Sequence, residues 1–428
     1  MSEGREGVDT VGLDTPPRLA VDRLLDDRET RIIVCCGAGG VGKTTTAAAL
    51  GVRAAARGRK AVVLTIDPAR RLAQSMGIDS LDNTPRKVAT TGGGGGGEDG
   101  GDGGELHAMM LDMKRTFDEI VEAHADAERA RAILANPFYQ SLSAGFAGTQ
   151  EYMAMEKLGQ LRARDDWDLI IVDTPPSRSA LDFLDAPKRL GSFLDGKFIR
   201  VLMAPAKVGG RAGMKFLNVG MSMMTGTLSK LMGASLLKDV QTFVAAMDTM
   251  FGGFRTRADA TFRLLQAPGT AFLVVAAPEP DALREAAYFV ERLASERMPL
   301  AGLVLNRVHG SGADQLSAER ALAAAENLEE GGIVDQESGK AGLRDTAAEP
   351  PGADDDTTAV DRITAGLLRL HAERMQVIAR EQRTRDRFTS LHPEVAVAEV
   401  AALPGDVHDL AGLRAIGERL AAGVPAGA

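Results

Sequence analysis

The residues best suited to chemistry lie in one glycine-rich stretch of the chain. Residues 37–44 read GAGGVGKT and match the spacing G-x-x-x-x-G-K-[ST] in full. Glycines let the backbone curl so that several N–H groups point inward and surround a chain of phosphates. In such a loop the Lys43 amine contacts the β- and γ-phosphates, and the Thr44 hydroxyl binds Mg²⁺. The stretch, called the P-loop below, therefore predicts a site for a nucleoside triphosphate.

The elements around the P-loop are those that such a site requires. Residues 32–36 form an apolar strand, residues 45–58 a helix and residues 61–66 a second strand. This order predicts a parallel βαβ unit, which binds its ligand at the carboxyl ends of its strands. The N-terminus of the helix adds a partial positive charge beneath the phosphates.

Two aspartates directly follow strands that we expect to end at the same edge of the sheet. Asp67 follows the strand 61–66, and Asp173 follows the strand 168–172. Four apolar residues followed by an acid at the end of a strand describe the Walker B position, which supports a magnesium ion. The sequence therefore predicts Thr44, Asp67 and Asp173 as the residues nearest to the metal.

The rest of the chain alternates between strands and helices. We predict one doubly wound, mostly parallel α/β sheet of about seven or eight strands, which is the P-loop NTPase fold, with an α-helical subdomain inserted. The predicted parts are a polar tail at 1–28, a single domain at 29–420, helical insertions at 114–165 and 187–265, and disordered loops at 91–105 and 329–358.

Composition excludes several classes of protein. The formal net charge of −9 argues against a general nucleic-acid binder. No run of 18 apolar residues is present, and the first ten residues are polar, so we expect no integral membrane segment, no signal peptide and a cytoplasmic setting. The two cysteines, Cys35 and Cys36, are adjacent on one strand and point to opposite faces. We therefore expect buried, inert thiols and no zinc site.

Three stretches together resemble a known family. They are G-x-G-G-V-G-K-T-T from residue 37, T-x-D-P-A from residue 65 and D-T-P-P from residue 173. The chain is similar to the arsenite-pump and tail-anchored-protein-targeting ATPases, which are P-loop ATPases with a deviant Walker A motif. The resemblance runs from about residue 30 to 420, and the segments 150–157 and 182–187 look most like the bacterial, especially actinobacterial, branch.

The resemblance implies ATP as substrate, Mg²⁺ as cofactor and a role for each matching residue. Asp67 would orient or polarise the attacking water, and Asp173 would support the Mg²⁺ shell and couple a switch to the nucleotide. The residues that would cradle the phosphates are Gly39, Gly40, Val41, Gly42, Lys43, Thr44 and Thr45.

The adenine side of the site follows from the same resemblance. Asn306 would hydrogen-bond the adenine edge, and the loop 404–410, with Pro404 and Asp406, would close over the base. The residues alone also allow another interpretation of Asn306, namely a polar strand-end residue that caps a turn.

The chain departs from the family at three points. Family members usually carry a lysine where this chain has Ala38, and that lysine crosses a face-to-face dimer to the partner's triphosphate. Arg178-Ser179 stands where the second switch usually has Gly-His, and the C-x-x-C that holds zinc in eukaryotic members is missing. We therefore expect a dimer that is either a homodimer with an arginine in the lysine's place or a heterodimer with a lysine-bearing paralogue.

The purpose of ATP hydrolysis is less determined than its chemistry. Methionine-rich surfaces bind varied apolar helices, so the insert 187–265 suggests a hydrophobic helical client, although methionines that merely fill a core are an equal alternative. An arsenite pump would need better-placed cysteines, and an ATP-binding regulatory subunit would need neither Lys43 nor Asp67. The eight methionines of the insert are Met203, Met214, Met221, Met223, Met224, Met232, Met247 and Met250.

Overall fold

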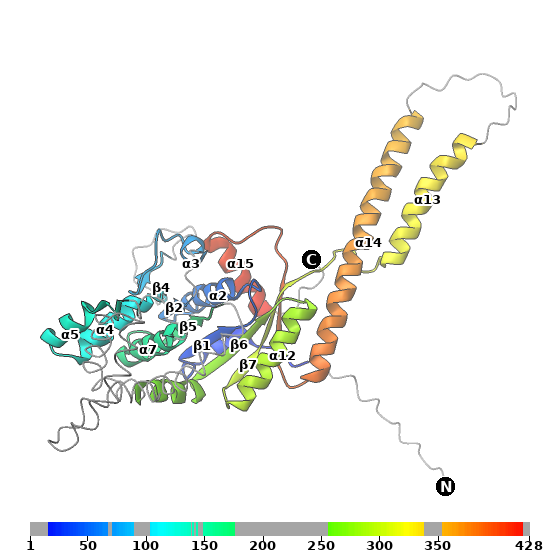
Figure 1. Ribbon diagram of the computed structural model, residues 1–428. Coiled ribbons are helices and arrows are strands. Elements are labelled where there is room, and N and C mark those ends of the chain that lie inside the picture. The colour runs from blue at the N-terminus through cyan, green and yellow to red at the C-terminus, as the bar shows by residue number, and fades with distance from the viewer. Residues whose placement is uncertain are drawn as a thin grey trace, which may run out of the picture.

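The computed structural model describes residues 16–66, 71–89, 103–137, 139–140, 143, 149–175, 256–337 and 353–422. Strands and helices alternate along most of this chain (Figure 1). The elements are α1 (Val21–Asp26), β1 (Ile32–Cys36), α2 (Lys43–Ala56), β2 (Ala61–Thr65), α3 (Arg71–Ser75), β3 (Arg86–Lys87), β4 (Leu106–Met110), α4 (Met113–His124), α5 (Ala127–Leu134), α7 (Thr149–Arg164), β5 (Leu169–Asp173), β6 (Thr270–Ala276), α12 (Pro280–Ser295), β7 (Leu300–Val308), α13 (Ala318–Glu337), α14 (Ala353–Leu391), β8 (Val397–Ala401) and α15 (Leu410–Ala422).

The strands form one eight-stranded sheet in the order β3-β4-β2-β5-β1-β6-β7-β8. Every pairing is parallel except that of β3 with β4, at one edge. Strand β1 lies between β5 and β6, with successive strands placed on both sides of it. In doubly wound sheets the ligand crevice lies at the carboxyl end of such a strand. The predicted fold class is confirmed, and the P-loop follows the strand at this point of the sheet.

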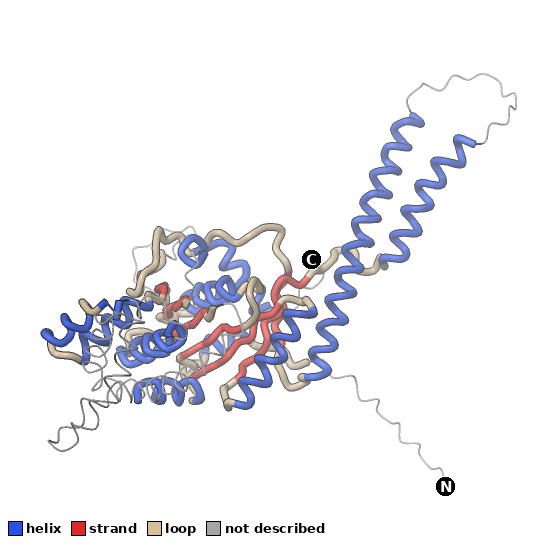
Figure 2. Tube along the Cα trace, viewed as in Figure 1, coloured by secondary structure: helices blue, strands red, loops and turns tan. Residues whose placement is uncertain are grey.

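Helices cover both faces of the sheet (Figure 2). Helices α1, α2, α3 and α15 contribute to the core on one face, and α4, α5, α7 and α12 contribute to the core on the other. Cys35 belongs to the first core and Cys36 to the second, and both thiols are buried. Burial raises the pKa of Cys35 and raises that of Cys36 to about 12. The prediction of two buried thiols on opposite faces is confirmed.

Two helices extend away from the sheet (Figures 1 and 2). Helix α13 packs along the first part of the 39-residue helix α14, and we call α13 and residues 353–376 the arm. Its seam consists of small side chains that are fully buried, namely Ala321, Ala325, Ala365 and Ala372. A stripe of large apolar side chains on α14 remains exposed, namely Val360, Ile363, Leu367 and Leu370.

The spacing of these residues explains the two faces of α14. Ala365 and Ala372 are seven residues apart and lie on one side of the helix, against α13. The exposed stripe repeats with steps of three, four and three residues and lies on the opposite side. Helix α14 therefore has the pattern of a helix with two neighbours, and the described chain supplies one of them over this length.

The boundaries of the predicted tail and loops need correction. Within residues 16–28, a short leading helix, α1, is part of the fold, because Val21 and Leu25 are buried and the Asp22 carboxylate pairs with Arg53 of α2 at 2.5 Å. The predicted loop 329–358 is helical over residues 329–337 and 353–358. Residues 103–105 of the other predicted loop are part of the fold, since Gly104 N donates to the Ala55 carbonyl at 3.1 Å.

The structure describes much of the first predicted helical insertion and little of the second. Residues 114–165 contain α5, α7 and all of α4 except its first residue. Most of the second insertion, with its eight methionines, lies outside the described residues, and only its end, residues 256–265, is seen as helix.

Candidate nucleotide-binding site

The P-loop follows β1 in a backbone conformation that requires glycine at two positions. Gly37 has φ 148°, and a Cβ there would lie 2.0 Å from the Val275 carbonyl oxygen of the neighbouring strand. Gly42 has φ 96°, and a Cβ there would lie 2.2 Å from Nδ2 of Asn306. No other residue satisfies both the left-handed backbone and the lack of space. The glycines of the motif are therefore used to curl the loop tightly against β6 and β7.

Lys43 is the first residue of α2 and is buried. Its Nζ donates to the carbonyl oxygen of Ala38 at 2.6 Å, so the side chain reaches back across the loop. An ammonium group in this position lies among the loop amides that phosphates would contact. A phosphate oxygen would compete with the Ala38 carbonyl for the lysine's hydrogen bond, which makes this contact suitable for exchange.

Hydroxyl groups of two elements converge on Asp173, the residue at the predicted Walker B position. Its Oδ2 accepts hydrogen bonds from Thr44 Oγ1 and from Thr65 Oγ1, each at 2.8 Å. Asp173 is fully buried at the end of β5, and Thr65 ends the neighbouring strand β2. Oxygen donors of this kind fit Mg²⁺, and Thr44 and Asp173 are the residues that would hold it. The third predicted ligand, Asp67, lies outside the described residues.

Backbone contacts hold the three central strand ends together. The N–H and the hydroxyl of Thr174 both donate to the Cys35 carbonyl, at 3.2 and 2.9 Å. The N–H of Ile66 donates to the carbonyl of Asp173 at 3.0 Å. The segments that would carry the two switches thus begin at fixed points beside the P-loop, while residues 67–70 and 176–255 lie outside the described chain.

Asn306 lies on β7, and its buried side chain contacts the P-loop directly. Its Nδ2 donates to the Val41 carbonyl at 2.8 Å, and the same atom is the one that a Cβ at Gly42 would meet. This contact supports the interpretation that Asn306 caps a turn. The hydrogen bond to adenine stays a prediction.

The loop 404–410 follows β8, two strands beyond β6 in the sheet. Pro404 and Asp406 are exposed, so both are free of the packed core. Asp409 caps helix α15, because its Oδ1 accepts from the N–H of Gly412 at 2.7 Å. Closure of the loop over a base stays a prediction.

A hollow of about 410 Å³ is lined on one side by Ala38, Gly39, Gly40 and Val41 of the P-loop, and the sequence motifs did not reveal its other side. Its lining includes the carboxylates of Glu279, Asp281 and Glu285 at the start of α12, together with Arg307. Two of these acids, Glu279 and Asp281, lie directly after β6 in the sequence. Their position after a strand end is the sequence feature from which the hollow could have been predicted. The hollow is an acidic recess at the position where the family lysine would stand.

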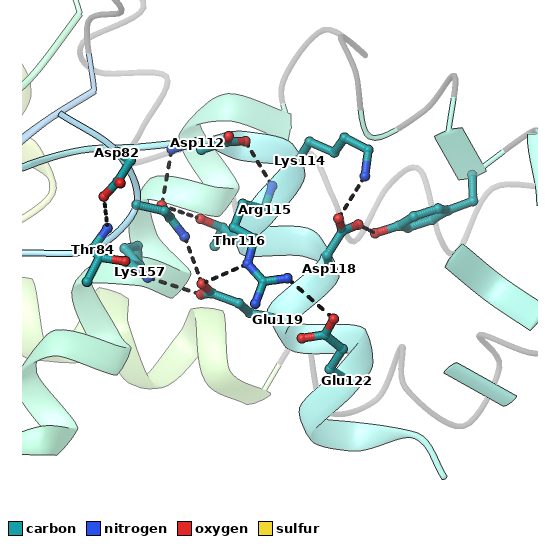
Figure 3. A network of polar contacts seen from close by, with 12 residues as sticks. Asp82, Thr84, Asp112, Lys114, Arg115, Thr116, Asp118, Glu119, Glu122 and Lys157 are labelled. Carbon is teal, nitrogen blue, oxygen red and sulfur yellow. Dashed lines mark hydrogen bonds and ion pairs between the residues drawn. The ribbon is translucent and has the colours of Figure 1, made fainter. Parts of the chain in front are cut away.

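The segment 150–157, which carries the resemblance to the bacterial branch, makes its polar contacts elsewhere (Figure 3). Lys157 is buried on α7 and donates to Glu119 of α4 at 3.0 Å, and burial lowers the pKa of this lysine. Asn83 also donates to Glu119, at 3.2 Å. These contacts join α4, α7 and the 82–84 loop, so they position the helical layer.

The described residues show no further metal site and no membrane helix. Within them, no group of three or more histidine, cysteine, aspartate or glutamate side chains could hold a metal ion. Likewise, no helix among the described ranges is long and apolar enough to cross a membrane.

The chain has recognisable relatives. Residues 30–330 match the family model described as anion-transporting ATPase. The ATPase GET3 of Podospora anserina is 26% identical over 307 residues, which cover 70% of this chain and 80% of that protein. The ATPase GET3 of Malassezia globosa is 28% identical over 181 residues, 42% of this chain and 49% of that protein.

A bacterial relative is similar over a shorter stretch. The ATPase BagA of Mycobacterium tuberculosis is 28% identical over 176 residues, which cover 39% of this chain and 48% of that protein. The chain thus spans about half the length of two of these three relatives and most of the length of the third.

Proposed function

This chain belongs to the anion-transporting ATPase family, and from that premise we propose that it is a Mg²⁺-dependent ATP hydrolase. The observation that carries the proposal is the hydrogen bond between Thr44 and Asp173, 2.8 Å long, beside a P-loop with sterically required glycines. A hydroxyl and a carboxylate meet there next to the loop that carries Lys43, and phosphoryl transfer from Mg-ATP uses such a set of groups.

Each residue has a separate task in the proposed reaction. The loop amides of Gly39 to Thr45 bind the phosphates, and Lys43 exchanges the Ala38 carbonyl for β/γ-phosphate oxygens. Thr44 and Asp173 hold Mg²⁺, which neutralises phosphate charge when bound. Asp67 orients a water whose oxygen bonds to the γ-phosphorus as the bond to the β–γ bridging oxygen breaks. The products are ADP, inorganic phosphate and a proton, which passes to solvent.

Two variants test this proposal. Lys43→Ala should abolish Mg-ATP binding or hydrolysis, whereas Lys60→Ala, which changes a half-exposed lysine, should leave both unchanged. Asp67→Asn should bind ATP while its turnover falls by roughly 10²-fold or more. Unchanged Mg-ATP affinity of Lys43→Ala in calorimetry contradicts the site, and wild-type turnover of Asp67→Asn contradicts the role of that aspartate.

We also propose that the active form is a dimer in which the partner completes this site, in keeping with Ala38. Charges supplied in trans to a transferring phosphoryl group are worth on the order of 10³–10⁵ in rate. The acidic recess of Glu279, Asp281 and Glu285 beside Ala38 supports docking of a basic side chain at that point. A heterodimer with a lysine-bearing paralogue is favoured over a homodimer, and the mycobacterial match supports a bacterial branch for this chain.

The ATPase rate of the chain alone, and after addition of the paralogue, separates these dimers. A heterodimer predicts a large increase on addition, with hydrolysis concentrated at Lys43 and Asp67 of this chain. Vigorous activity of the chain alone that is lost in Arg178→Ala and indifferent to the paralogue would favour the homodimer instead.

Handling of a hydrophobic helical client is the remaining part of the proposal, in a cytoplasmic setting. It rests on the methionine-rich insert, which lies outside the described residues. Replacement of Met221, Met223 and Met224 by serine should weaken binding of an apolar helical peptide at an unchanged melting temperature. A lowered melting temperature without loss of peptide affinity means that these methionines fill a core.

Two other functions compete with this proposal. An ATP-binding regulatory subunit with little hydrolysis needs no Asp67, so the presence of that residue favours hydrolysis. A subunit of an arsenite-efflux pump needs accessible thiols, whereas Cys35 and Cys36 are buried.

A further inference from the structure

A second and larger hollow lies between α12 and the last part of α14. It has a volume of about 1,020 Å³ and also includes His309, which follows β7. The two helices pack against each other, and the figures show them side by side at the end of α14 that is far from the arm (Figures 1 and 2). We call this hollow the α12–α14 groove. No part of it belongs to the P-loop.

The floor of the groove is apolar and fixed to the core. Leu283 of α12 and Phe388 of α14 are buried, and Ala287 and Val377 beside them are half-buried. At the end of the groove, the side chain of Leu391 is 66% exposed. A large apolar side chain exposed at the margin of an apolar hollow is typical of a binding surface.

The rim of the groove is basic although the chain as a whole is acidic. The lining contains four arginines and two glutamates, in a protein of net charge −9. Arg380, Arg383 and Arg387 follow each other along α14 at steps of three and four residues, so they line one side of the helix. Among the described residues, none of these three arginines forms an ion pair, and the Nε groups of Arg380 and Arg383 donate to carbonyls of their own helix.

Other charged groups of the same region are already used. Arg385, which lies between these arginines in sequence, pairs with the buried Glu399 of β8 at 2.8 Å. Glu381 accepts from the Nδ1 of His309 at 2.6 Å. Arg284 of the lining pairs with Asp281 at 3.0 Å. These charges are therefore paired within the fold, whereas Arg380, Arg383 and Arg387 are left for a group outside it.

We propose that the α12–α14 groove binds an acidic amphipathic helix of a partner protein. A groove between two packed helices accepts the side-chain ridge of a third helix. The residues from Val377 to Leu391 span about 21 Å of α14, enough for roughly four turns of a bound helix. Apolar side chains of the partner would cover Phe388 and Leu391, and its carboxylates would pair with the guanidinium groups of Arg383 and Arg387.

The groove is also connected to the nucleotide site. Glu279, in the turn between β6 and α12, lines both the groove and the acidic recess beside Ala38. A helix bound in the groove would thus contact the same turn that borders the P-loop. The proposal does not depend on hydrolysis of ATP, since the groove is formed by described residues outside the P-loop.

The test uses the full chain and a labelled helical peptide of about 16 residues. Leucines at positions i, i+3, i+7 and i+10 give the peptide one apolar face, and glutamates flank it. Fluorescence anisotropy should show saturable binding that weakens severalfold when salt is raised from 50 to 500 mM. A peptide with lysine in place of glutamate should bind at least tenfold more weakly. Equal binding of the two peptides overturns the proposal.

Matched variants locate the site. Arg383→Glu with Arg387→Glu should weaken binding of the acidic peptide at least tenfold, whereas Arg320→Glu with Arg362→Glu, the same charge change on exposed arginines of the arm, should change it less than twofold. Leu391→Asp should also weaken binding, with unchanged circular dichroism. Equal losses in the two arginine pairs overturn the proposal, because they would show attraction by overall charge alone.

Two further measurements exclude other occupants. If vesicles with anionic lipid bind through Arg383 and Arg387 and the peptide does not, the groove binds a membrane surface and the proposal is wrong. If sedimentation shows a dimer that dissociates in the same double variant while the peptide fails to bind, the occupant is a second copy of the chain and the proposal is equally wrong.

Discussion

The P-loop and the arm differ in which side chains they bury and which they expose. In the P-loop region, polar groups are buried and bonded to one another, as Lys43 is to Ala38 and Asn306 to Val41. In the arm, large apolar side chains such as Ile363 and Leu367 are exposed, while alanines are buried. The first region is organised inward around a ligand position. The second has one packed side and one side without a neighbour in the described chain.

The difference indicates what each region binds. Burial of unbonded polar groups costs about 1–3 kcal/mol each, so the P-loop holds its donors on internal carbonyls until phosphate replaces them. Exposing an apolar side chain to water costs less free energy than burying an unbonded polar group. A contiguous exposed apolar stripe is typical of a surface that a partner covers. Four experiments, each comparing a packed position with an exposed one, would sharpen or break this contrast.

The largest expected difference concerns thiol reactivity. Cys35 and Cys36 end the strand that leads into the P-loop, and burial raises the pKa of Cys36 to about 12, so that its thiolate is scarce at pH 8. Leu367→Cys places a thiol on the exposed stripe, where an ordinary pKa of about 8.5 applies. The new thiol should react with dithionitrobenzoate about 10³-fold faster or more.

The pH dependence supplies the control. The rate of the new thiol should rise with pH and level off above about pH 9, whereas the native thiols should still be gaining reactivity there. Addition of denaturant should make all thiols equal. Fast labelling of the native protein without the substitution would mean that β1 opens readily, and the contrast in burial would fail.

The second experiment makes the same substitution at two glycines and expects opposite signs. Gly42→Ala forces a side chain into φ 96° and within 2.2 Å of Asn306 Nδ2, so Mg-ATP affinity should fall about 10²-fold. Gly366→Ala adds a methyl group in α14 where nothing lies within 4 Å. Because alanine favours a helix, this variant should be more stable by about 0.5–1 kcal/mol.

Calorimetry measures the first effect and thermal unfolding the second. If Gly42→Ala binds Mg-ATP as the parent does, the loop can relax and its tight curl is not required. If Gly366→Ala lowers the melting temperature, a neighbour covers that side of α14, and the arm is less exposed than its structure indicates.

These two regions also differ in how far the sequence predicted them. The P-loop and Asp173 were predicted because their chemistry needs particular residue types at short spacing, and Gly37 and Gly42 are constrained by their own backbone. The sheet was predicted because its strands are short apolar runs between helices. Of its eight strands, only the two-residue β3 lacks such a run.

The misses concern contacts between distant parts of the chain. The hydrogen bond between Asn306 and Val41 joins residues 265 positions apart, and burial of α1 depends on α2 and α15. The first turns of α14 were missed because Asp354 to Asp356 suggested a solvated loop, although acidic residues are also favoured in the first turn of a helix. No local sequence pattern predicted the α12–α14 groove, because its arginines are spaced like those on any solvent-exposed helix.

The third experiment compares the two sides of α14 within the arm. Ala372 is fully buried against α13, so Ala372→Leu overfills the seam and should destabilise the chain by about 1–3 kcal/mol. Leu367 is 61% exposed, so Leu367→Gln should change stability by less than about 0.5 kcal/mol. Urea unfolding monitored by circular dichroism measures both. Equal losses would show that the stripe is already packed, and the unpartnered side of the arm would not exist.

The smallest expected difference compares one buried hydrogen bond with one exposed ion pair. Asn306→Ala removes the 2.8 Å hydrogen bond to Val41 and leaves that carbonyl buried, which should cost about 1–2 kcal/mol. Glu329→Ala removes the pair with Arg369 in the arm, whose side chains are 38% and 50% exposed, and should cost about 0.5 kcal/mol or less. Raising the salt concentration should abolish the second loss and leave the first, because only the exposed pair is screened. Mg-ATP affinity adds an independent readout, since Asn306→Ala loosens the loop that carries Lys43 and Glu329→Ala changes nothing near it. A larger loss for Glu329→Ala than for Asn306→Ala would mean that the arm, and not the P-loop, depends on its polar contacts.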